Sequence, residues 1–218
     1  MLLPLGEQRD PRMTVTAKIL AATAAALAST ATAAGAAQAP IAINVQPAVV
    51  TTNASVQVFG RIPTNRGDED ISVDSWACGG YGVWMHVATI KTTSLGAWTT
   101  TANVDTTTKF RARWRGSSST AAVVRVRPSI LLDVDRRGHL LIVVRGNAPF
   151  GHAMLQRRRG NRWVALRTIA LDRGAMPESS GADLKLRLAR PTTVRLVLTA
   201  NQVGRCYLPS VSDPVTVR

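Results

Sequence analysis

Apolar and polar side chains alternate along short segments of this chain. Between Lys109 and Arg115, the apolar residues Phe110, Ala112 and Trp114 are separated by basic ones. A period of two places successive side chains on opposite faces of an extended strand. The same alternation returns in 123–127 and in 183–189. Each segment therefore predicts a β-strand with one apolar face and one solvent-facing face rich in arginine and lysine.

Turn-forming residues separate these segments at short intervals. Clusters of Gly, Pro, Asn and Ser occur in 62–68, 116–119, 145–147 and 159–161. Beyond the N-terminal region, the apolar residues show no helical period of 3.6. Regular short strands with intervening turn signals are typical of β-sandwiches and barrels, so the pattern predicts an all-β fold.

The sequence contains an internal repeat, in which the same order of segments occurs twice. Aligning Trp84 with Trp163 places a threonine five residues later and an isoleucine six residues later in both copies. Further on, residues 107–114 match residues 192–199. The two units are 40–128 and 129–218, and Pro128 marks their junction. Units near 90 residues with about seven strands suit the immunoglobulin-like (Ig-like) sandwich, so we expect two tandem Ig-like β-sandwiches.

The N-terminal region has the features of a signal peptide. Lys18 is followed by an uncharged segment, 19–39, which contains a short apolar run and ends in Ala-Gln-Ala. The segment is long enough to span a membrane, but it is mostly Ala and Thr, which favours cleavage over anchoring. Residues 1–39 are thus predicted to be removed, leaving no membrane span. Translation from Met13 would give a more ordinary signal peptide, so residues 1–12 could precede the true start.

Charge and cysteine content indicate which partners and which cellular compartment the chain is suited to. The chain carries 27 Lys and Arg against 13 Asp and Glu, a formal net charge of +14, and 23 of the cations are arginines. Selection for bidentate anion contacts would explain this bias, but so would a GC-rich genome, which the high alanine content favours. The two cysteines, Cys78 and Cys206, cannot form a CxxC zinc site. In an exported chain we expect them to form one disulfide; the alternative is two separate buried thiols.

Motifs for enzymatic chemistry are missing from the sequence. HExxH, GxSxG, GxGxxG and the P-loop do not occur. His86, His139 and His152 have no metal-ligand neighbour at a useful spacing, and we interpret each as a surface or strand histidine. We therefore predict a chain without catalytic activity, cofactor or metal.

An acidic run offers a weak alternative to this view. Asp68, Glu69, Asp70 and Asp74 could form an oxygen-rich calcium loop, but they lack EF-hand spacing, and a solvated turn entering a strand is favoured. The tripeptide 66–68 reads Arg-Gly-Asp, which arises easily by chance in so short a motif. Asn53 begins a lone glycosylation sequon.

The strongest sign of binding is a basic turn in the second unit. Arg157, Arg158, Arg159 and Arg162 surround Gly160 and Asn161 in a predicted hairpin. Residues 129–218 hold 15 basic and six acidic residues, a net charge of +9, against +4 for 40–128. A projecting cationic turn could hold an anionic polymer, although a solvated turn of a basic protein is slightly favoured. Nucleic acid is not expected, because the turn lacks a recognised reading element or outward aromatics, and Trp163 is expected in the core.

Several segments together resemble a known kind of protein. They are CGG (78–80), LGAW (95–98), TTTKFRARWRG (106–116) and VRVRP (124–128) in the first unit, and 155–171 and 206–218 in the second. The chain resembles the tandem bacterial Ig-like repeats of secreted high-GC Gram-positive proteins, across nearly all of its predicted mature length. The resemblance implies secretion or exposure at the cell surface, and half-cystines in different units, in agreement with a Cys78–Cys206 bridge. We expect a structural or adhesive envelope protein, or alternatively a module that binds teichoic acid or acidic polysaccharide. Its expected partners are an envelope polymer or a surface protein.

Overall fold

The computed structural model of the chain describes residues 41–135, 137–147, 150–173, 178–186 and 191–217. Regular structure in these ranges is almost entirely β-strand, and the single helix there is α1 (Ala200–Val203). No helix in the described part has the length and apolar character needed to cross a membrane. The predicted all-β class is confirmed, whereas the predicted signal segment, 1–39, lies outside the described residues.

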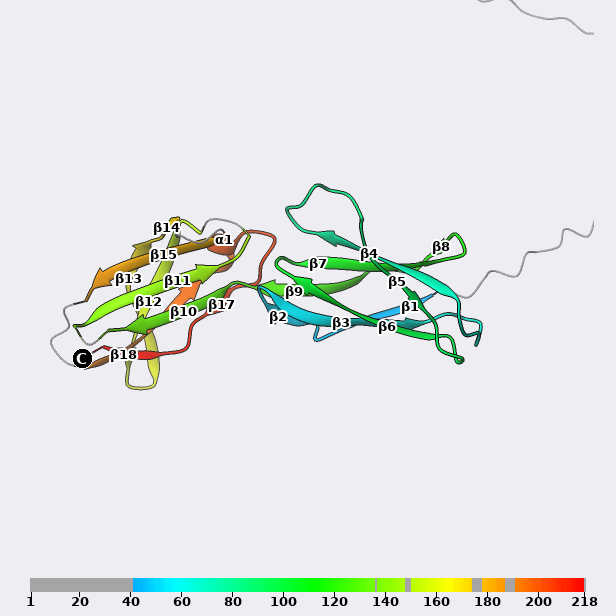
Figure 1. Ribbon diagram of the computed structural model, residues 1–218. Coiled ribbons are helices and arrows are strands. Elements are labelled where there is room, and N and C mark those ends of the chain that lie inside the picture. Colours follow the sequence, from blue (N-terminus) through cyan, green and yellow to red (C-terminus); the bar gives the residue numbers. More distant parts are fainter. Residues whose placement is uncertain (1–40, 136, 148–149, 174–177, 187–190, 218) are drawn as a thin grey trace, which may run out of the picture. The chain divides into compact units, whose positions relative to one another are not determined.

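The segment before Pro128 forms two sheets that face each other (Figure 1). One sheet has the order β1-β3-β6, and the other has the order β2-β9-β7-β4-β5 with β8 added beside β7. The pair β2–β9 is parallel and the other pairs are antiparallel. The strands are β1 (Ala42–Gln46), β2 (Val49–Thr51), β3 (Ala54–Arg61), β4 (Asp70–Ala77), β5 (Met85–Lys91), β6 (Ala97–Val104), β7 (Thr108–Trp114), β8 (Ser117–Ser118) and β9 (Ala122–Arg127).

The segment after Pro128 forms a second pair of sheets. Their orders are β10-β11-β15-β14 and β13-β12-β16-β17, with β18 also paired to β16. All of these pairs are antiparallel. The strands are β10 (Ser129–Val134), β11 (His139–Arg145), β12 (His152–Arg159), β13 (Arg162–Ala170), β14 (Asp172–Arg173), β15 (Ser179–Lys185), β16 (Thr192–Leu198), β17 (Ser210–Val211) and β18 (Val215–Val217). Each half is thus an Ig-like β-sandwich.

Alternation along the strands separates core from surface as the sequence predicts. On β7, Phe110, Ala112 and Trp114 are buried, whereas Lys109 and Arg113 are exposed. Each large apolar side chain buried in this way stabilises the fold by about 1.5–3 kcal/mol. The core side chains of the first sandwich include Val56, Val58, Ile71, Val73, Trp98, Val124 and Val126, and those of the second include Leu140, Ile142, Val144, Leu155, Val194, Leu196 and Leu198.

The two sandwiches share one local arrangement in corresponding strands. The β4–β5 hairpin lies beside β7, and the β12–β13 hairpin lies beside β16. Both hairpins contain a bulge, formed by the unpaired Val87 of β5 and by the unpaired Leu166 of β13. The predicted match of residues 107–114 with 192–199 is wrong by one position, because Val194 is buried as Phe110 is, whereas the ungapped match would pair Phe110 with Arg195.

Candidate functional site

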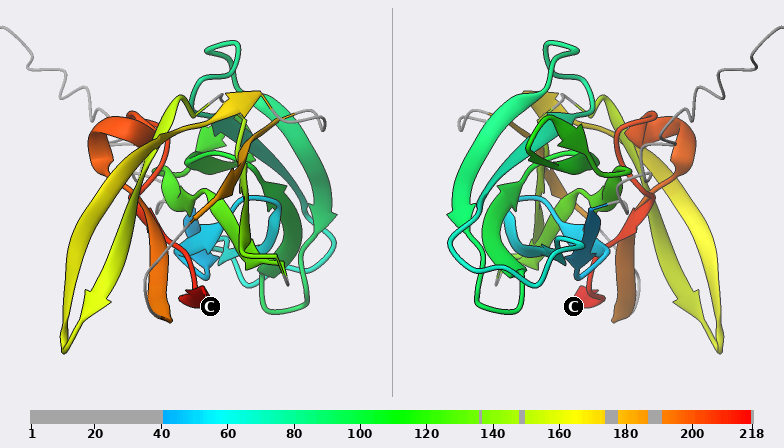
Figure 2. Two further views of the ribbon diagram at one scale, coloured as in Figure 1. Left: turned by 90° about the vertical axis from the view of Figure 1, so that its left-hand side faces the viewer. Right: turned by 90° about the vertical axis from the view of Figure 1, so that its right-hand side faces the viewer.

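The predicted basic turn is the tip of the β12–β13 hairpin. Arg159 and Arg162 are cross-strand partners, and Gly160 and Asn161 connect them. Gly160 has a φ of 55°, in the left-handed region where glycine is not penalised by a Cβ atom. Figure 2 shows this hairpin, in yellow-green and yellow, extending beyond the neighbouring strands of its sheet. The turn therefore presents its side chains to solvent.

The four arginines of this turn do not all lie on the same face. Arg157 is the cross-strand partner of the buried Val194, so its side chain starts on the core side of the sheet and is half-buried. Its Nε atom is buried and makes no hydrogen bond within the described residues. Arg158, Arg159 and Arg162 are exposed, and Arg158 Nε donates a 3.1 Å hydrogen bond to the Gly160 carbonyl oxygen. Three guanidinium groups remain accessible at the tip.

The outer face of the same sheet extends this cationic surface. The Arg195 guanidinium lies 4.3 Å from the centre of the Trp163 ring and donates a 2.9 Å hydrogen bond from Nε to Gln156 Oε1. Trp163 is half-buried beneath this guanidinium, so its predicted place in the core is wrong. Within the described ranges, neither Arg195 nor any of the four turn arginines takes part in an ion pair. Their charge is therefore available to an external anion.

The corresponding place in the first sandwich carries an internal anion instead. The Arg111 guanidinium lies 4.3 Å from the Trp84 ring centre, and its Nε donates a 3.0 Å hydrogen bond to Asp74 Oδ2. Arg113 Nε lies 2.8 Å from the same oxygen, and His86 Nδ1 lies 3.7 Å from Oδ1. Burial disfavours the charged carboxylate, but hydrogen bonds and charge from both arginines outweigh it and hold the pKa of Asp74 below its ordinary value. One carboxylate therefore holds both arginines and balances one of their two charges within the sandwich.

The predicted acidic run does not converge into a cation site. Asp74 is buried in β4, although the sequence places it in a solvated turn entering a strand. Glu69 accepts hydrogen bonds from Trp114 Nε1 (3.1 Å) and from Arg115, which together lower the pKa of Glu69. Asp70 forms an exposed ion pair with Lys91 (2.8 Å). In the part of the chain that the structure describes, no group of three or more His, Cys, Asp or Glu side chains could hold a metal ion.

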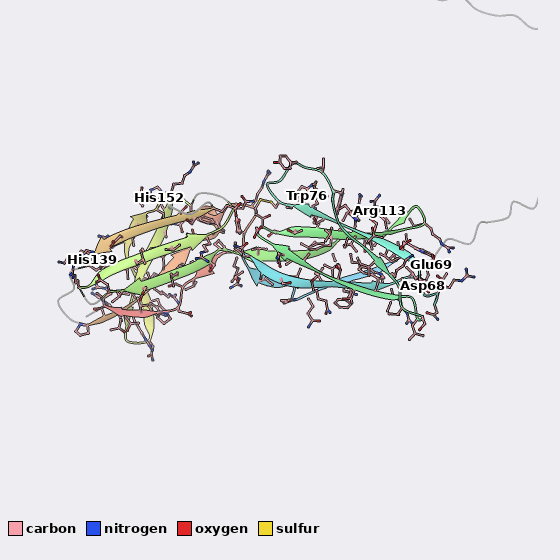
Figure 3. All side chains as sticks on the ribbon, in the orientation of Figure 1. Asp68, Glu69, Trp76, Arg113, His139 and His152 are labelled. Carbon is pink, nitrogen blue, oxygen red and sulfur yellow. A yellow bond between two sulfur atoms is a disulfide. The ribbon has the colours of Figure 1, made fainter. Side chains whose placement is uncertain are left out.

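The remaining motifs lie apart from the basic turn. The Arg66–Asp68 tripeptide is tied to Thr92, which donates a 2.8 Å hydrogen bond to the Arg66 carbonyl oxygen and accepts one at its own carbonyl from the Asp68 amide (3.0 Å). Figure 3 shows His139 and His152 at separate positions, and His139 lies 3.3 Å from an Asp183 oxygen. Asn53 is an exposed residue in the turn between β2 and β3.

The predicted disulfide is present between Cys78 and Cys206, whose Cα atoms are 5.4 Å apart. It joins the end of β4 to the segment that follows α1. Backbone hydrogen bonds run alongside it, from the Thr107 amide to the Cys206 carbonyl (3.0 Å) and from the Leu208 amide to the Val126 carbonyl (2.8 Å). Both sandwiches therefore contribute to one covalently closed joint.

One arrangement recurs on the outer faces of both sandwiches: an arginine covers a tryptophan and donates a hydrogen bond to a side chain on the adjacent strand. This arrangement was not predicted from the sequence. Its members are Trp84, Arg111 and Asp74 in the first sandwich, and Trp163, Arg195 and Gln156 in the second. The paired tryptophans signal it in the sequence, but the partners depend on strand register. Gln156 takes the place that Asp74 has in the first sandwich, so Arg195 donates to a neutral side chain instead of a carboxylate.

No family model and no curated protein matches this sequence. Among solved structures, the chain is similar to the human OSCAR ligand-binding domain at 13% identity and a TM-score of 0.29, over 82% of this chain and 98% of that one. A cytokine receptor complex in crystal form 1A matches at 12% identity and a TM-score of 0.33, over 81% and 94% of the two chains. A cytokine receptor complex in crystal form 2 matches at 12% and 0.31, over 79% and 99%. The Ig-like assignment therefore rests on the sheet topology above, and not on these similarities.

Proposed function

We propose that this protein is an exported, non-catalytic module of a bacterial cell envelope with a structural or adhesive role. In this proposal residues 1–39 are a signal peptide, and 40–128 and 129–218 are two Ig-like domains. The observation that carries the proposal is the joint, where the Cys78–Cys206 disulfide and adjacent backbone hydrogen bonds fasten the two sandwiches. Disulfides persist outside the reducing cytosol, and a fastened pair of sandwiches suits a load-bearing or spacing role.

Expression of the full chain in a high-GC Gram-positive host tests this proposal. The chain should be recovered from the wall or the medium, shortened at its N-terminus, and should change mobility on a denaturing gel when reductant is added. A Cys78→Ser, Cys206→Ser double variant should be exported without that mobility change. Recovery of the wild-type chain in the cytosol with free thiols would contradict the proposal.

A second candidate function is binding of an anionic envelope polymer, such as teichoic acid or acidic polysaccharide, at the β12–β13 tip. It is favoured by Arg158, Arg159 and Arg162, which are exposed and make no ion pair within the described residues, and by the neighbouring Arg195. The planar guanidinium group of arginine can donate two parallel hydrogen bonds to a phosphate or carboxylate group. Release of counterions from the polymer would make the binding salt-dependent.

Co-sedimentation of the protein with purified cell-wall sacculi tests this second function. Binding should be present at low salt, lost at high salt, and weakened when Arg158, Arg159 and Arg162 are replaced by serine. Arg125→Ser with Arg127→Ser is the matched control, because those arginines are exposed on β9 in the other sandwich. Equal binding by the turn variant and the wild type would exclude the turn as the site.

A further inference from the structure

The loop between β4 and β5 exposes a group of apolar side chains that the proposed function does not use. Tyr81 is 95% exposed, Val83 is 53% exposed and Met85 is 57% exposed. These three residues, at alternate positions, are named the apolar loop group here. Figure 1 shows the segment between β4 and β5 standing away from the strands that it connects. Single exposed apolar residues are ordinary on a protein surface, but three within five positions, two on the projecting loop and Met85 at the start of β5, indicate an interaction site.

The base of this loop is anchored, and two glycines in left-handed conformations shape its tip. Cys78 at its start is bonded to Cys206, and the Gly80 amide donates a 3.2 Å hydrogen bond to the Ala77 carbonyl oxygen. Gly79 and Gly82 have φ values of 78° and 72°, which other residues rarely adopt. The glycines thus let the tip project from a fixed base.

Basic side chains lie over the tryptophans that flank the apolar loop group, and the loop itself contains no carboxylate. Residues 78–84 contain no acidic residue. Lys109 Nζ lies 5.1 Å from the centre of the Trp76 ring just before the loop, and the Arg111 guanidinium lies over Trp84 at its end. Arg205, next to the bridged Cys206, is exposed. Asp74 balances only one of the two charges of Arg111 and Arg113.

We infer that the apolar loop group docks on the surface of an anionic lipid bilayer. Anionic headgroups attract lysine and arginine near the membrane surface, and tyrosine and tryptophan favour the interface between headgroups and acyl chains. Val83 and Met85 distinguish this ligand from an anionic polysaccharide, because aliphatic side chains bind neither sugar hydroxyls nor phosphates but gain from entering hydrocarbon. A projecting loop can insert into a lipid bilayer, because the lipids are fluid and rearrange around it.

Vesicle co-sedimentation of the full chain tests this inference. The probe is an equimolar mixture of phosphatidylglycerol and phosphatidylcholine, compared with phosphatidylcholine alone. The wild-type chain should bind the anionic vesicles more strongly, and Tyr81→Ser with Val83→Ser should weaken that binding by about tenfold or more, since two apolar side chains no longer enter the bilayer. A matched control is Leu131→Ser with Leu141→Ser, which removes similarly exposed side chains from β10 and β11.

A second measurement reports the loop directly. In a Tyr81→Trp variant, the difference in indole emission from the wild type, which has five tryptophans of its own, should shift to shorter wavelength when anionic vesicles are added, because the side chain leaves water. Unchanged emission, or equal vesicle binding by the serine variant, would overturn the inference. Loss of vesicle binding only in the Arg158, Arg159 and Arg162 variant would assign lipid binding to the β12–β13 tip instead. A loop-dependent oligomer seen by sedimentation velocity without vesicles would assign the loop to a second copy of the chain.

Discussion

Replacement of Asp74 by asparagine should destabilise the protein more than any other change of a single carboxylate described here. The Asp74 side chain is 3% exposed and accepts hydrogen bonds from Arg111 Nε (3.0 Å) and Arg113 Nη2 (3.2 Å), with Arg113 Nε 2.8 Å away. Hydrogen bonds to a charged group contribute about 1.5–3 kcal/mol each to stability. The two arginine side chains are 28% and 49% exposed, so water competes for them and roughly halves that contribution.

Asparagine has nearly the same volume and keeps one oxygen acceptor, so Asp74→Asn tests charge rather than packing. We expect it to lower the free energy of unfolding by about 2–3 kcal/mol at neutral pH. The corresponding fall in the melting temperature is about 5–10 °C. Urea unfolding followed by tryptophan fluorescence would measure the difference.

The pH dependence of the unfolding free energy distinguishes loss of the Asp74 charge from a general loss of packing. Because the pKa of Asp74 is lowered in the folded protein, its contribution is complete above the ordinary carboxyl pKa near 4 and disappears as the pH falls through the lower folded pKa. The stability gap between wild type and Asp74→Asn should therefore stay constant from about pH 7 to 5 and close at lower pH. A gap that is absent at pH 7, or that persists unchanged at about pH 2, would refute the reasoning. Asp70→Asn, which removes an exposed partner of Lys91, should leave the unfolding free energy unchanged.

Three further changes have defined outcomes. Gly60→Ala should lower the unfolding free energy by about 2 kcal/mol, because a Cβ atom there would overlap the Ala42 carbonyl oxygen, whereas Gly151→Ala, where nothing lies within 4 Å, should have little effect in the same urea titration. Reduction of the Cys78–Cys206 bridge should lower stability by about 4–5 kcal/mol through the loop of 128 residues that it closes, measured by unfolding with and without dithiothreitol. Burial raises the pKa of Tyr207 to about 12, so stability should fall as the pH rises from about 10 to 12, and Tyr207→Phe should flatten that decline in unfolding midpoints taken across this range.

The architecture could be read from the sequence because each strand carries its own signal. Phe110, Ala112 and Trp114 alternate with cations, and a period of two fixes which face is buried whatever the neighbouring strand is. The hairpin around Gly160 and the pairing of the only two cysteines could be predicted for a similar reason, since local turn chemistry and cysteine number determine them.

The contacts of the outer faces could not be read in this way, because they depend on which residues lie opposite each other across strands. Asp74 meets Arg111 in the register of β4 with β7, and the unpaired Val87 of β5 shifts the β4–β5 pairing near Trp84. A bulge inserts one residue without a clear mark in the sequence. For the same reason, Trp163 was expected in the core and lies instead under Arg195.

The bridge between Cys78 and Cys206 also determines what a protease can do to this chain. The two cysteines lie 128 positions apart, on opposite sides of Pro128. A single cut anywhere between them, for example at the exposed turn of Gly160 and Asn161 where nicking tends to occur, leaves two fragments that are still one covalent molecule. The chain can be severed without being shed, and only a reductant then releases the pieces.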